Sequence, residues 1–325
     1  MKAAVFRQYG PLDVVGIEDV DKPVPDDDQV LIAIRAASVN ALDVHSVAGK
    51  PFLVRMMFGV RRPKVPRLGV DVAGRVETVG KAVTAFKPGD AVFGNCRGAF
   101  AEYGCAKESA LAIKPDGVTF EQAASIPVAG FTALQALRKG KVRAGQNILV
   151  NGAGGGVGTF AVQLAKASGA EVTGVTHTRN LDRIRAIGAD HVVDYTREDF
   201  TRSGARYDLI VDCHSTHSLP ACRRALNPGG TYLAIGGPIR RSIDPLVSAI
   251  SGLVLSCLGS RKLRMFMAKR SKDDLATIIG LVKEGKVTPV IDRRFRLSET
   301  RDALRYLADG NVCGKIVITP DGSET

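Results

Sequence analysis

The sequence has few cysteines, and none of them are arranged in pairs. They are scattered along 325 residues without a Cys-x-x-Cys spacing, at Cys96, Cys105, Cys213, Cys222, Cys257 and Cys313. This scatter argues against a disulfide framework and against a zinc lobe held by four clustered cysteines, so a reducing cytoplasm is the expected compartment. The chain also lacks a basic and apolar leader followed by small residues, and we expect no export signal.

Long hydrophobic runs are also missing. Residues 243–258 are mostly apolar, but Ser248, Ser251 and Gly252 interrupt the stretch, which is too short to span a membrane. We expect a packed helix there. A basic amphipathic contact with a membrane surface is the alternative, because basic residues follow directly.

Acidic residues are outnumbered by basic ones. The chain carries 45 Lys and Arg against 33 Asp and Glu, a formal net charge of +12. The basic residues are dispersed, with local concentrations at residues 61–62, 240–241 and 261–270, and no nucleic-acid motif or aromatic stacking pattern accompanies them. We therefore expect no specific nucleic-acid site, but a solvated basic surface that can attract an anionic cofactor. A polyanion-binding protein is the alternative.

The sequence does contain a concentrated run of glycines after an apolar strand. Residues 148–151 are typical of a buried parallel strand, and five glycines follow within residues 152–158. Apolar residues then recur at helical spacing from Phe160 to Ala165. A strand, a tight turn and a helix in this order predict a dinucleotide-binding site, because backbone N–H groups at the helix start can hold a pyrophosphate. The expected cofactor-binding residues of the turn are Gly154, Gly155, Gly156, Val157 and Gly158.

The order of the expected elements predicts an α/β protein with two domains. Short strands with frequent turns indicate a β-rich domain, with strands at residues 2–7, 29–38, 69–79, 91–94, 287–297 and 314–319. Strands at residues 148–151, 171–176, 191–194, 209–212 and 231–236 then alternate with helices at residues 160–168, 180–187 and 218–225. This alternation predicts a doubly wound parallel sheet with helices on both faces. We place the β-rich domain at residues 1–122 with 262–325, and the nucleotide-binding domain at residues 123–261.

The glycine stretch resembles one family in particular. Its Ala153-Gly154-Gly155-Gly156-x-Gly158 core is similar to the signature of the quinone oxidoreductase and zeta-crystallin branch of the medium-chain dehydrogenase/reductases, in which an alanine or serine replaces the first glycine of the generic fingerprint. The flanking residues share the family spacing as well: Gly145, Gln146, Leu149, Gln163 and Lys166. Residues 98–103 and 127–133 resemble the GroES-like catalytic domain of the same superfamily. The resemblance implies a GroES-like domain, a Rossmann NADP-binding domain, and a homodimer formed through the sheet edge near residues 233–237.

The end of the second nucleotide-domain strand indicates which dinucleotide binds. In this fold an acidic residue about 20 residues after the glycines binds the ribose of NAD, but here Thr176 stands in that place and Thr178 and Arg179 follow. Hydroxyls and a guanidinium can bind a 2′-phosphate that a carboxylate would repel. We therefore predict NADPH over NADH, with Arg179 as the main phosphate partner and Thr176 or Thr178 assisting. By resemblance Tyr195 lies near the adenosine phosphate, and the proximity of Asp182 leaves dual specificity open.

A zinc alcohol dehydrogenase is the main competing interpretation. Its catalytic metal needs two cysteines and one histidine, but by resemblance these places are held by Asn40, Val70 and Val128. We therefore expect no metal. Without a Lewis acid, hydride transfer to an electron-poor acceptor is easier than oxidation of an alcohol. This favours an NADPH-dependent, zinc-free reductase of a small quinone or enone, and a catalytically silent NADPH-binding sensor is the alternative.

Further active-site residues are expected from the resemblance. Asn40 and Asp43 lie in the loop that borders the nicotinamide. Asn40 bonds either the nicotinamide ribose or the acceptor oxygen, or else it stabilises the turn, and Asp43 orients the loop. His45 stands where some relatives carry a tyrosine and is a candidate proton donor, although a lone histidine is more often a structural group. Thr132 matches a threonine that packs beside the nicotinamide ring.

Two strand ends complete the expected cofactor site. Ligands in open α/β sheets bind outside the carboxyl ends of the strands. Cys213 follows the fourth strand of the nucleotide-binding domain, and Ile235, Gly236 and Gly237 end the fifth. These residues are therefore expected to border the cofactor. Cys213 has no activating neighbour in the sequence, so we assign it no chemistry.

Overall fold

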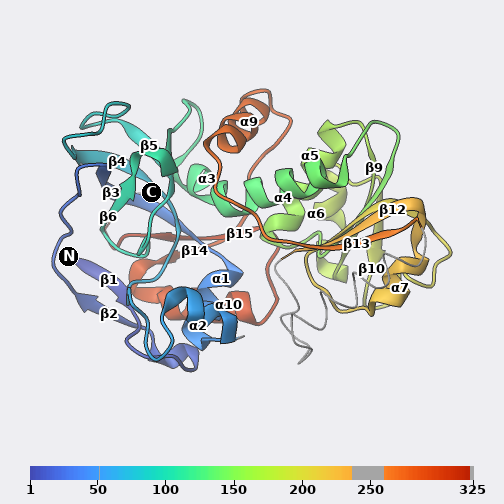
Figure 1. Ribbon diagram of the computed structural model, residues 1–325, viewed down its shortest axis with the longest axis horizontal. Coiled ribbons are helices and arrows are strands. Elements are labelled where there is room, and N and C mark those ends of the chain that lie inside the picture. Colours follow the sequence, from blue (N-terminus) through green and yellow to red (C-terminus); the bar gives the residue numbers. More distant parts are fainter. Residues whose placement is uncertain (51, 236–259, 323–325) are drawn as a thin grey trace. The chain divides into compact units, whose positions relative to one another are not determined.

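The chain folds into two compact units. The computed structural model describes residues 1–50, 52–235 and 260–322. The first unit comprises Met1–Val128, Arg270–Ile279 and Pro289–Thr325, and the second comprises Ala129–Lys269 and Gly280–Thr288 (Figure 1). The divisions at residues 128 and 269 lie a few residues after those expected from the sequence, at 122 and 261.

Mostly antiparallel strands build the first unit. They are β1 (Lys2–Val5), β2 (Gly16–Asp19), β3 (Gln29–Val39), β4 (Asp71–Val79), β5 (Ala91–Asn95), β6 (Tyr103–Lys107), β7 (Leu111–Ile113), β14 (Ile291–Arg296) and β15 (Lys315–Thr319). β1 pairs with β2, and the larger sheet has the order β14-β15-β3-β4-β5-β7, with β6 paired to β3. The helices of this unit are α1 (Ala41–Ala48), α2 (Phe52–Phe58), α3 (Phe120–Ser125) and α10 (Thr300–Ala308), with short 3-10 turns at Leu12–Val14, Glu108–Ala110 and Leu297–Glu299.

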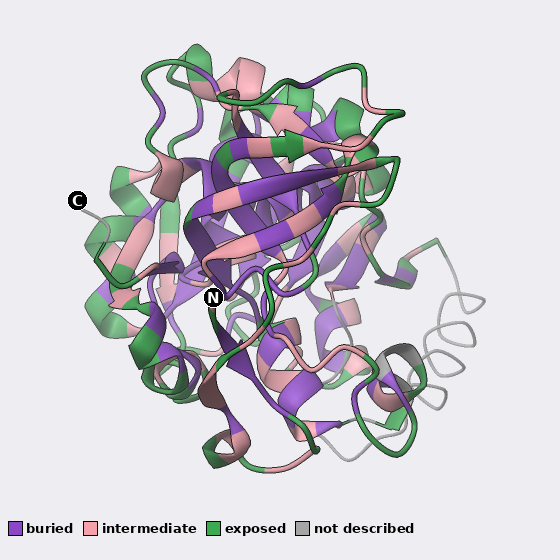
Figure 2. Ribbon diagram, turned by 90° about the vertical axis from the view of Figure 1, so that its left-hand side faces the viewer, coloured by how far each residue is buried: buried purple, intermediate pink, exposed green. Residues whose placement is uncertain are grey.

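β3 is the central strand of the first unit, because it pairs with β4, β6 and β15. Buried positions run along this sheet (Figure 2), and Ile32, Val72 and Ile316 belong to one hydrophobic cluster. The C-terminal strand β15 is antiparallel to β3, with Ile316 opposite Val39. This pairing brings Lys315 next to the residues that follow β3, where the polar cluster described below is built.

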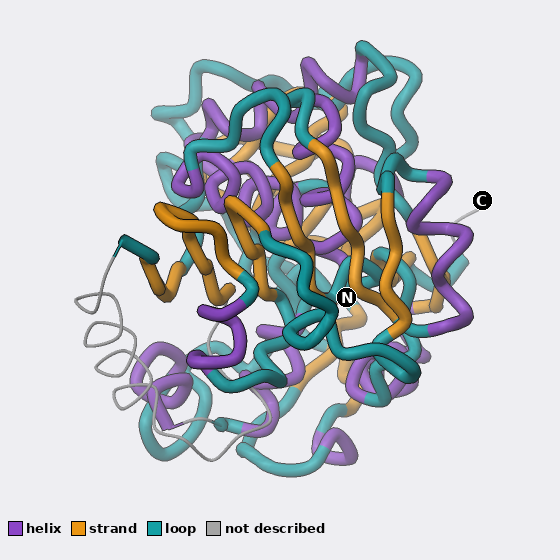
Figure 3. The backbone as a smooth tube through the Cα atoms, turned by 90° about the vertical axis from the view of Figure 1, so that its right-hand side faces the viewer, coloured by secondary structure: helices purple, strands orange, loops and turns teal. Residues whose placement is uncertain are grey.

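A six-stranded parallel sheet forms the second unit (Figure 3). Its strands are β8 (Asn147–Asn151), β9 (Glu171–Thr176), β10 (His191–Asp194), β11 (Tyr207–Asp212), β12 (Leu226–Ile235) and β13 (Lys262–Phe266), in the order β10-β9-β8-β11-β12-β13. The helices α5 (Gly156–Ala167), α6 (Leu181–Ala186) and α7 (Leu219–Arg224) connect them, and Thr178–Asn180 is a 3-10 turn. α4 (Pro127–Gly140) and α9 (Lys272–Lys283) contain the residues at which the chain divides. The strand order reverses between β8 and β11, which confirms the doubly wound sheet.

Helices cover both faces of the parallel sheet. Cys222 of α7 packs in one buried cluster with Leu149 of β8. Gly174 of β9 faces α6 instead, because a Cβ at this position would lie 2.6 Å from Cγ2 of Ile184. Gly174 is paired with Val150, the neighbour of Leu149, and successive residues of a strand point to opposite faces. α6 and α7 therefore lie on opposite sides, as predicted.

The strand β13 was not expected from the sequence. Its exposed residues include Lys262 and Arg264, whereas Leu263 and Phe266 are buried. The segment is therefore a half-buried strand, although its sequence is rich in basic residues. β13 belongs to the second unit, although residues from 262 on were expected in the first. It also pairs with residues 231–235 of β12. Residues 233–235 of the segment expected to form the dimer edge are therefore covered, and β13 is the outermost of the described strands of this sheet.

Some expectations fall on parts of the chain that the structure does not describe. Gly236, Gly237 and the apolar stretch 243–258 lie outside the described residues. Within the described ranges, none of the helices has the length and apolar character needed to cross a membrane.

Candidate active site

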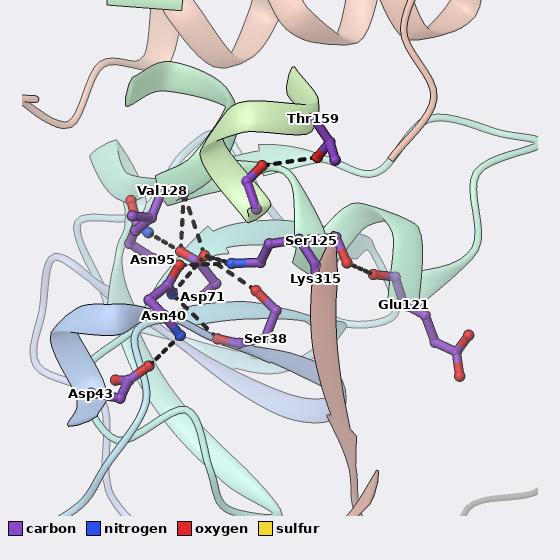
Figure 4. A network of polar contacts seen from close by, with 11 residues as sticks. Ser38, Asn40, Asp43, Asp71, Asn95, Glu121, Ser125, Val128, Thr159 and Lys315 are labelled. Carbon is purple, nitrogen blue, oxygen red and sulfur yellow. Dashed lines mark hydrogen bonds and ion pairs between the residues drawn. The ribbon is translucent and has the colours of Figure 1, made fainter. Parts of the chain in front are cut away.

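A buried polar cluster in the first unit surrounds the carboxylate of Asp71 (Figure 4). Asp71 is the first residue of β4 and is fully buried. Its Oδ1 accepts a hydrogen bond from Asn95 Nδ2 at 2.8 Å, and its Oδ2 accepts from Asn40 Nδ2 at 3.0 Å and from Ser38 Oγ at 3.3 Å. The backbone N–H of Val128 donates to Oδ1 at 3.2 Å. These donors compensate for the water that the carboxylate has lost.

Lys315 and Asp43 add two further charged groups. Lys315 Nζ donates to Asn40 Oδ1 at 2.7 Å and lies 3.7 Å from Asp71 Oδ2, and the Lys315 side chain is only 3% exposed. The Asp43 carboxylate accepts the backbone N–H of Asn40 at 2.8 Å. The Asn40 amide donates to Asp71 and also to the backbone oxygen of Ser38, at 3.3 Å. Asn40 therefore links all three charged groups, and both hydrogens of its amide are engaged.

Asn40 and Asp43 form the start of a helix, where the sequence analysis expected a loop. Asn40 has an extended backbone (φ −126°, ψ 156°) and is the N-cap of α1. The Asp43 N–H donates to the Asn40 carbonyl at 2.9 Å, and the Asp43 side chain returns a bond to the Asn40 N–H. This reciprocal pair is a capping arrangement. It supports the turn-stabilising interpretation of Asn40 and the orienting role expected of Asp43.

Burial shifts the pKa of each charged group in this cluster. Desolvation raises the pKa of Asp43 to about 7. The Asp71 carboxylate raises it as well, whereas the hydrogen bond from Asn40 and the charge of Lys315 oppose the shift. Burial also raises the pKa of Asp71, against the opposing effect of Lys315, and it lowers the pKa of Lys315, against the effect of the two acids. Burial therefore favours the neutral form of all three groups.

The structure brings together the positions where a zinc alcohol dehydrogenase would hold its metal. Asn40 and Val128 both bond the Asp71 carboxylate, and Val70 directly precedes Asp71. An amide and two isopropyl groups do not supply the thiolate and imidazole ligands of catalytic zinc, so this donor set does not fit the metal. In the described part of the chain, no three His, Cys, Asp or Glu side chains gather in a way that could hold a metal ion.

The other two expected catalytic residues lie on helices. His45 is on α1 and half buried, and burial lowers the pKa of its imidazole below the ordinary value. The ring is therefore neutral at neutral pH and a weak proton donor. Thr132 is in α4, only 6% exposed, and belongs to the second unit.

The glycine run forms the predicted turn between β8 and α5. Gly152 has a left-handed backbone (φ 83°), and Gly152 and Ala153 donate their N–H groups to the Val175 oxygen at 3.1 and 2.9 Å. Gly155 donates to the Gly152 oxygen at 3.0 Å and is the N-cap of α5. The following N–H groups, starting at Gly156, open the helix and have no acceptor within it. A helix start of this kind can bind an anion.

The glycines of this turn serve different purposes. A Cβ at Gly158 would lie 2.1 Å from the Gly152 oxygen, so Gly158 permits close packing of α5 on the strand. A Cβ at Gly154 would lie 2.7 Å from Thr176 Oγ1. At Gly155 the nearest atom would be 3.4 Å away, an ordinary contact. The fold does not need a glycine at 155, so the space there fits a ligand that approaches the backbone closely, such as a pyrophosphate.

The predicted phosphate-binding residues lie after β9, in different surroundings. Thr176 is 3% exposed, whereas Thr178 and Arg179 are exposed in the 3-10 turn that follows. The Thr178 hydroxyl donates to Asp194 Oδ2 at 2.5 Å and, with other donors, lowers the pKa of Asp194 to about 2. Tyr195 is 51% exposed next to Asp194. The Thr178 hydroxyl is therefore engaged with a carboxylate, while Arg179 stands on the surface of the same edge.

Cys213 lies beside the glycine turn. The Cys213 N–H donates to the Asn151 oxygen at 3.0 Å. A Cβ added at Gly152 would lie 3.4 Å from the Cβ of Cys213. Burial raises the pKa of the Cys213 thiol, so the thiol is unreactive. The preceding Asp212 is fully buried and accepts hydrogen bonds from Asn151 Nδ2 at 2.9 Å and from the Tyr232 hydroxyl at 2.8 Å.

The parallel sheet brings the expected cofactor residues to one edge. Thr176, Cys213 and Ile235 stand at or just after the carboxyl ends of β9, β11 and β12. Sequence reasoning missed three charged residues that organise the site: Asp194, Asp212 and Lys315. Each is a buried charged residue at the first or last position of its strand. A charge in that position must find buried partners, and this signal could have identified all three.

The chain is similar to known dehydrogenases and reductases over nearly its whole length. The chain matches the family described as alcohol dehydrogenase GroES-like domain over residues 26–116 and the family described as zinc-binding dehydrogenase over residues 187–318. A chloroplastic quinone-oxidoreductase of Triphysaria versicolor is 33% identical over 98% of both chains. The chloroplastic NADPH-dependent alkenal/one oxidoreductase of Arabidopsis thaliana is 33% identical over 98% of this chain and 80% of its own. The solved quinone oxidoreductase from Coxiella burnetii is 30% identical with a TM-score of 0.88, covering 98% of this chain and 99% of that one.

The substitution Asp43→Asn should remove part of the pH dependence of stability. Between about pH 4 and pH 7 the folded chain keeps a proton on Asp43 that the unfolded chain has released. The contribution of this group to the free energy of unfolding is therefore full below about pH 4 and falls as the pH rises to about 7. Asparagine resembles the protonated form, so the variant should gain stability relative to wild type over this range. Urea unfolding at several pH values measures the difference, with the exposed Asp309→Asn as the control. A difference that does not change with pH would contradict the assignment.

The substitution Gly158→Ala should destabilise the protein more than Gly155→Ala does. The Cβ at 158 would overlap the Gly152 oxygen, and such overpacking costs about 1–3 kcal/mol. At Gly155, where φ is −76°, alanine meets only an ordinary contact, and the loss should be below about 1 kcal/mol. Urea unfolding of both variants measures the two values, and equal losses would refute the packing role of Gly158.

Proposed function

Because the chain belongs to the quinone oxidoreductase branch of the medium-chain dehydrogenase/reductases, we propose that it is an NADPH-dependent reductase of quinones or α,β-unsaturated carbonyl compounds. The turn from Ala153 to Gly158 is the observation that carries the proposal. It supplies a helix start with open N–H groups and, at Gly155, a backbone that a pyrophosphate can approach. Two relatives named for reduction of quinones and of alkenals or alkenones support the acceptor class.

NADPH selectivity rests on the residues after β9. Thr176 occupies the place of the acid that binds the ribose of NAD, so no carboxylate there repels a 2′-phosphate. The Thr178 hydroxyl is held by Asp194, so we assign Thr178 to fixing the turn and Arg179 to binding the phosphate. Asp182, which would favour NADH, forms an ion pair with Arg185 at 2.9 Å. The name of the NADPH-dependent relative supports the same choice.

The reaction adds one hydride and one proton to the acceptor. Bound NADPH supplies the hydride. Both amide hydrogens of Asn40 are engaged, and Lys315 uses one lone pair of the Asn40 Oδ1. We therefore assign the other lone pair of Oδ1 to accepting a hydrogen bond from a hydroxyl of the nicotinamide ribose. Thr132 is assigned to packing against the nicotinamide ring. His45 is the candidate to pass the proton on: its imidazole would take up a proton from water and give it to the acceptor, returning to the neutral ring that burial favours.

The proposed enzyme works without zinc, although one matching family is named for zinc binding. The support is the donor set at Asn40, Val70 and Val128, which offers a catalytic zinc no thiolate or imidazole. Quinones and enones are already electron-poor, so positioning and hydrogen bonding can suffice for hydride transfer.

We also propose a homodimer in the cytoplasm. The edge strand β13 is the available contact, because residues 231–235 of β12 are already paired with it. The cysteines within the described residues are free thiols, which fits a reducing compartment. Two of the relatives are chloroplastic, so the cytoplasm is proposed for this chain alone.

The central test is cofactor binding followed by turnover. Purified protein of measured zinc content should bind NADPH more tightly than NADH and should oxidise NADPH with 1,2-naphthoquinone or a short enone series. Fluorescence titration and loss of NADPH absorbance give the two readouts. Binding without turnover would indicate a catalytically silent sensor, and one tightly held zinc per chain would refute the zinc-free mechanism.

The substitution Arg179→Ala tests the phosphate assignment. Loss of a guanidinium that bonds the 2′-phosphate should weaken NADPH binding by about tenfold or more, while NADH binding changes little. Arg143→Ala removes the same charge from an exposed residue before the amino end of β8 and serves as the matched control. Fluorescence titration with both cofactors measures the change, and equal weakening of NADPH and NADH would exclude the assigned role.

A further inference from the structure

A small open pocket in the first unit borders the polar cluster around Asp71. Its volume is ≈ 60 Å³, and its apolar lining includes Phe6, Leu42, Leu68 and Val70. Asp43 also lines it. Val70 precedes Asp71, and Asp43 bonds the Asn40 backbone. The pocket is therefore continuous with the residues assigned to the reaction.

Three basic side chains line the same pocket: Lys64, Arg67 and Arg97. None of them forms an ion pair with a residue that the structure describes. Among the described lining residues, Asp43 is the only acidic one, and it has a pKa of about 7 and accepts the Asn40 backbone N–H. The pocket thus carries an excess of positive charge that the described protein groups do not neutralise.

The segment that supplies two of these cations is strongly basic. Residues 44–70 contain six Lys and Arg and no Asp or Glu. Residues 245–272 have the same excess, with six Lys and Arg and no Asp or Glu, but the pocket lining includes none of their described residues. One-sided charge next to a partly buried cavity attracts an anion and concentrates it there.

The two arginines are held at the pocket by backbone contacts. Arg67 forms an isolated β-bridge with Val5, and its side chain lies against Gly98, where a Cβ would be 2.8 Å from Arg67 Cβ and 3.3 Å from its Nε. Gly98 has a left-handed backbone (φ 82°), so it leaves room for that side chain. Arg97 stands between Cys96 and Gly98, whose N–H groups donate to the oxygens of Val70 and Gly69 at 2.8 and 3.0 Å.

We propose that the acceptor carries an anionic group, a carboxylate or a phosphate, and that Arg67 and Arg97, with Lys64, bind it. Guanidinium groups recognise both anions through paired hydrogen bonds. The electron-poor carbonyl of the same molecule then lies toward Asn40 and Val70, which adjoin the pocket. This inference rests on the proposed reductase function and specifies its substrate class.

The test compares acceptors that differ in one charge. One pair is 4-oxopent-2-enoate and its methyl ester, and the other is 5-hydroxypent-3-en-2-one as its phosphate monoester and as the free alcohol. The wild type should have a higher kcat/KM for the anionic member of at least one pair than for the neutral member. The pair that shows this difference identifies the anion as a carboxylate or a phosphate. Arg67→Gln should lower the anionic-to-neutral ratio by about tenfold, and Arg97→Gln should lower it in the same direction.

Matched measurements separate binding of the anion from folding and from general charge effects. Arg35→Gln removes one charge from β3, outside the pocket, and should leave the ratio unchanged. NADPH binding should be unchanged in all three variants, and if Arg67→Gln fails to fold, Arg97→Gln carries the test. A ratio that neither pocket variant changes would overturn this inference while the reductase function stands. If the wild type reduces none of the four acceptors and no quinone, both the anion-binding inference and the reductase function are overturned.

Discussion

The first unit depends on the hydrogen bonds and the ion pair that the buried Asp71 carboxylate makes. A fully buried charge costs several kcal/mol unless partners replace its water. Here the partners come from β3, β5, β15 and the start of α4, segments that are far apart in the sequence. One carboxylate therefore fixes four segments together. Asn40, the N-cap of α1, is one of these partners, and Val70, which precedes Asp71, lines the pocket described above.

The second unit also contains a buried carboxylate that joins separate strands. Asp212 is fully buried at the carboxyl end of β11 and bonds Asn151 of β8 and Tyr232 of β12. β8 and β12 are the two neighbours of β11 in the sheet, and the strand order reverses between β8 and β11. The glycine turn begins at the residue after Asn151, so its position depends on this buried carboxylate. Backbone hydrogen bonds of Gly152, Ala153 and Gly155 hold the turn in shape.

Local patterns in the sequence predicted what depends on neighbouring residues. The apolar runs of β9 and β10 and the glycine turn were placed correctly because strand propensity and turn chemistry act over a few residues. The contact of Lys315 with Asn40 joins residues 275 positions apart, and no local pattern encodes such a contact. The Thr178–Asp194 bond likewise requires the alignment of β9 and β10. β13 was missed because its two buried residues, Leu263 and Phe266, are three positions apart, so the segment lacks the period-2 alternation of a strand.

The position of Asp43 gives the basic pocket a further property. Asp43 lines the pocket and titrates at about pH 7, so the charge of the pocket itself changes within the physiological range. An anion bound nearby disfavours the ionised carboxylate, and thermodynamic linkage then requires that binding be accompanied by uptake of part of a proton from solution. The observed heat of binding would consequently vary with the ionisation enthalpy of the buffer, and the enzyme would hold an anionic acceptor more tightly in an acidified cell.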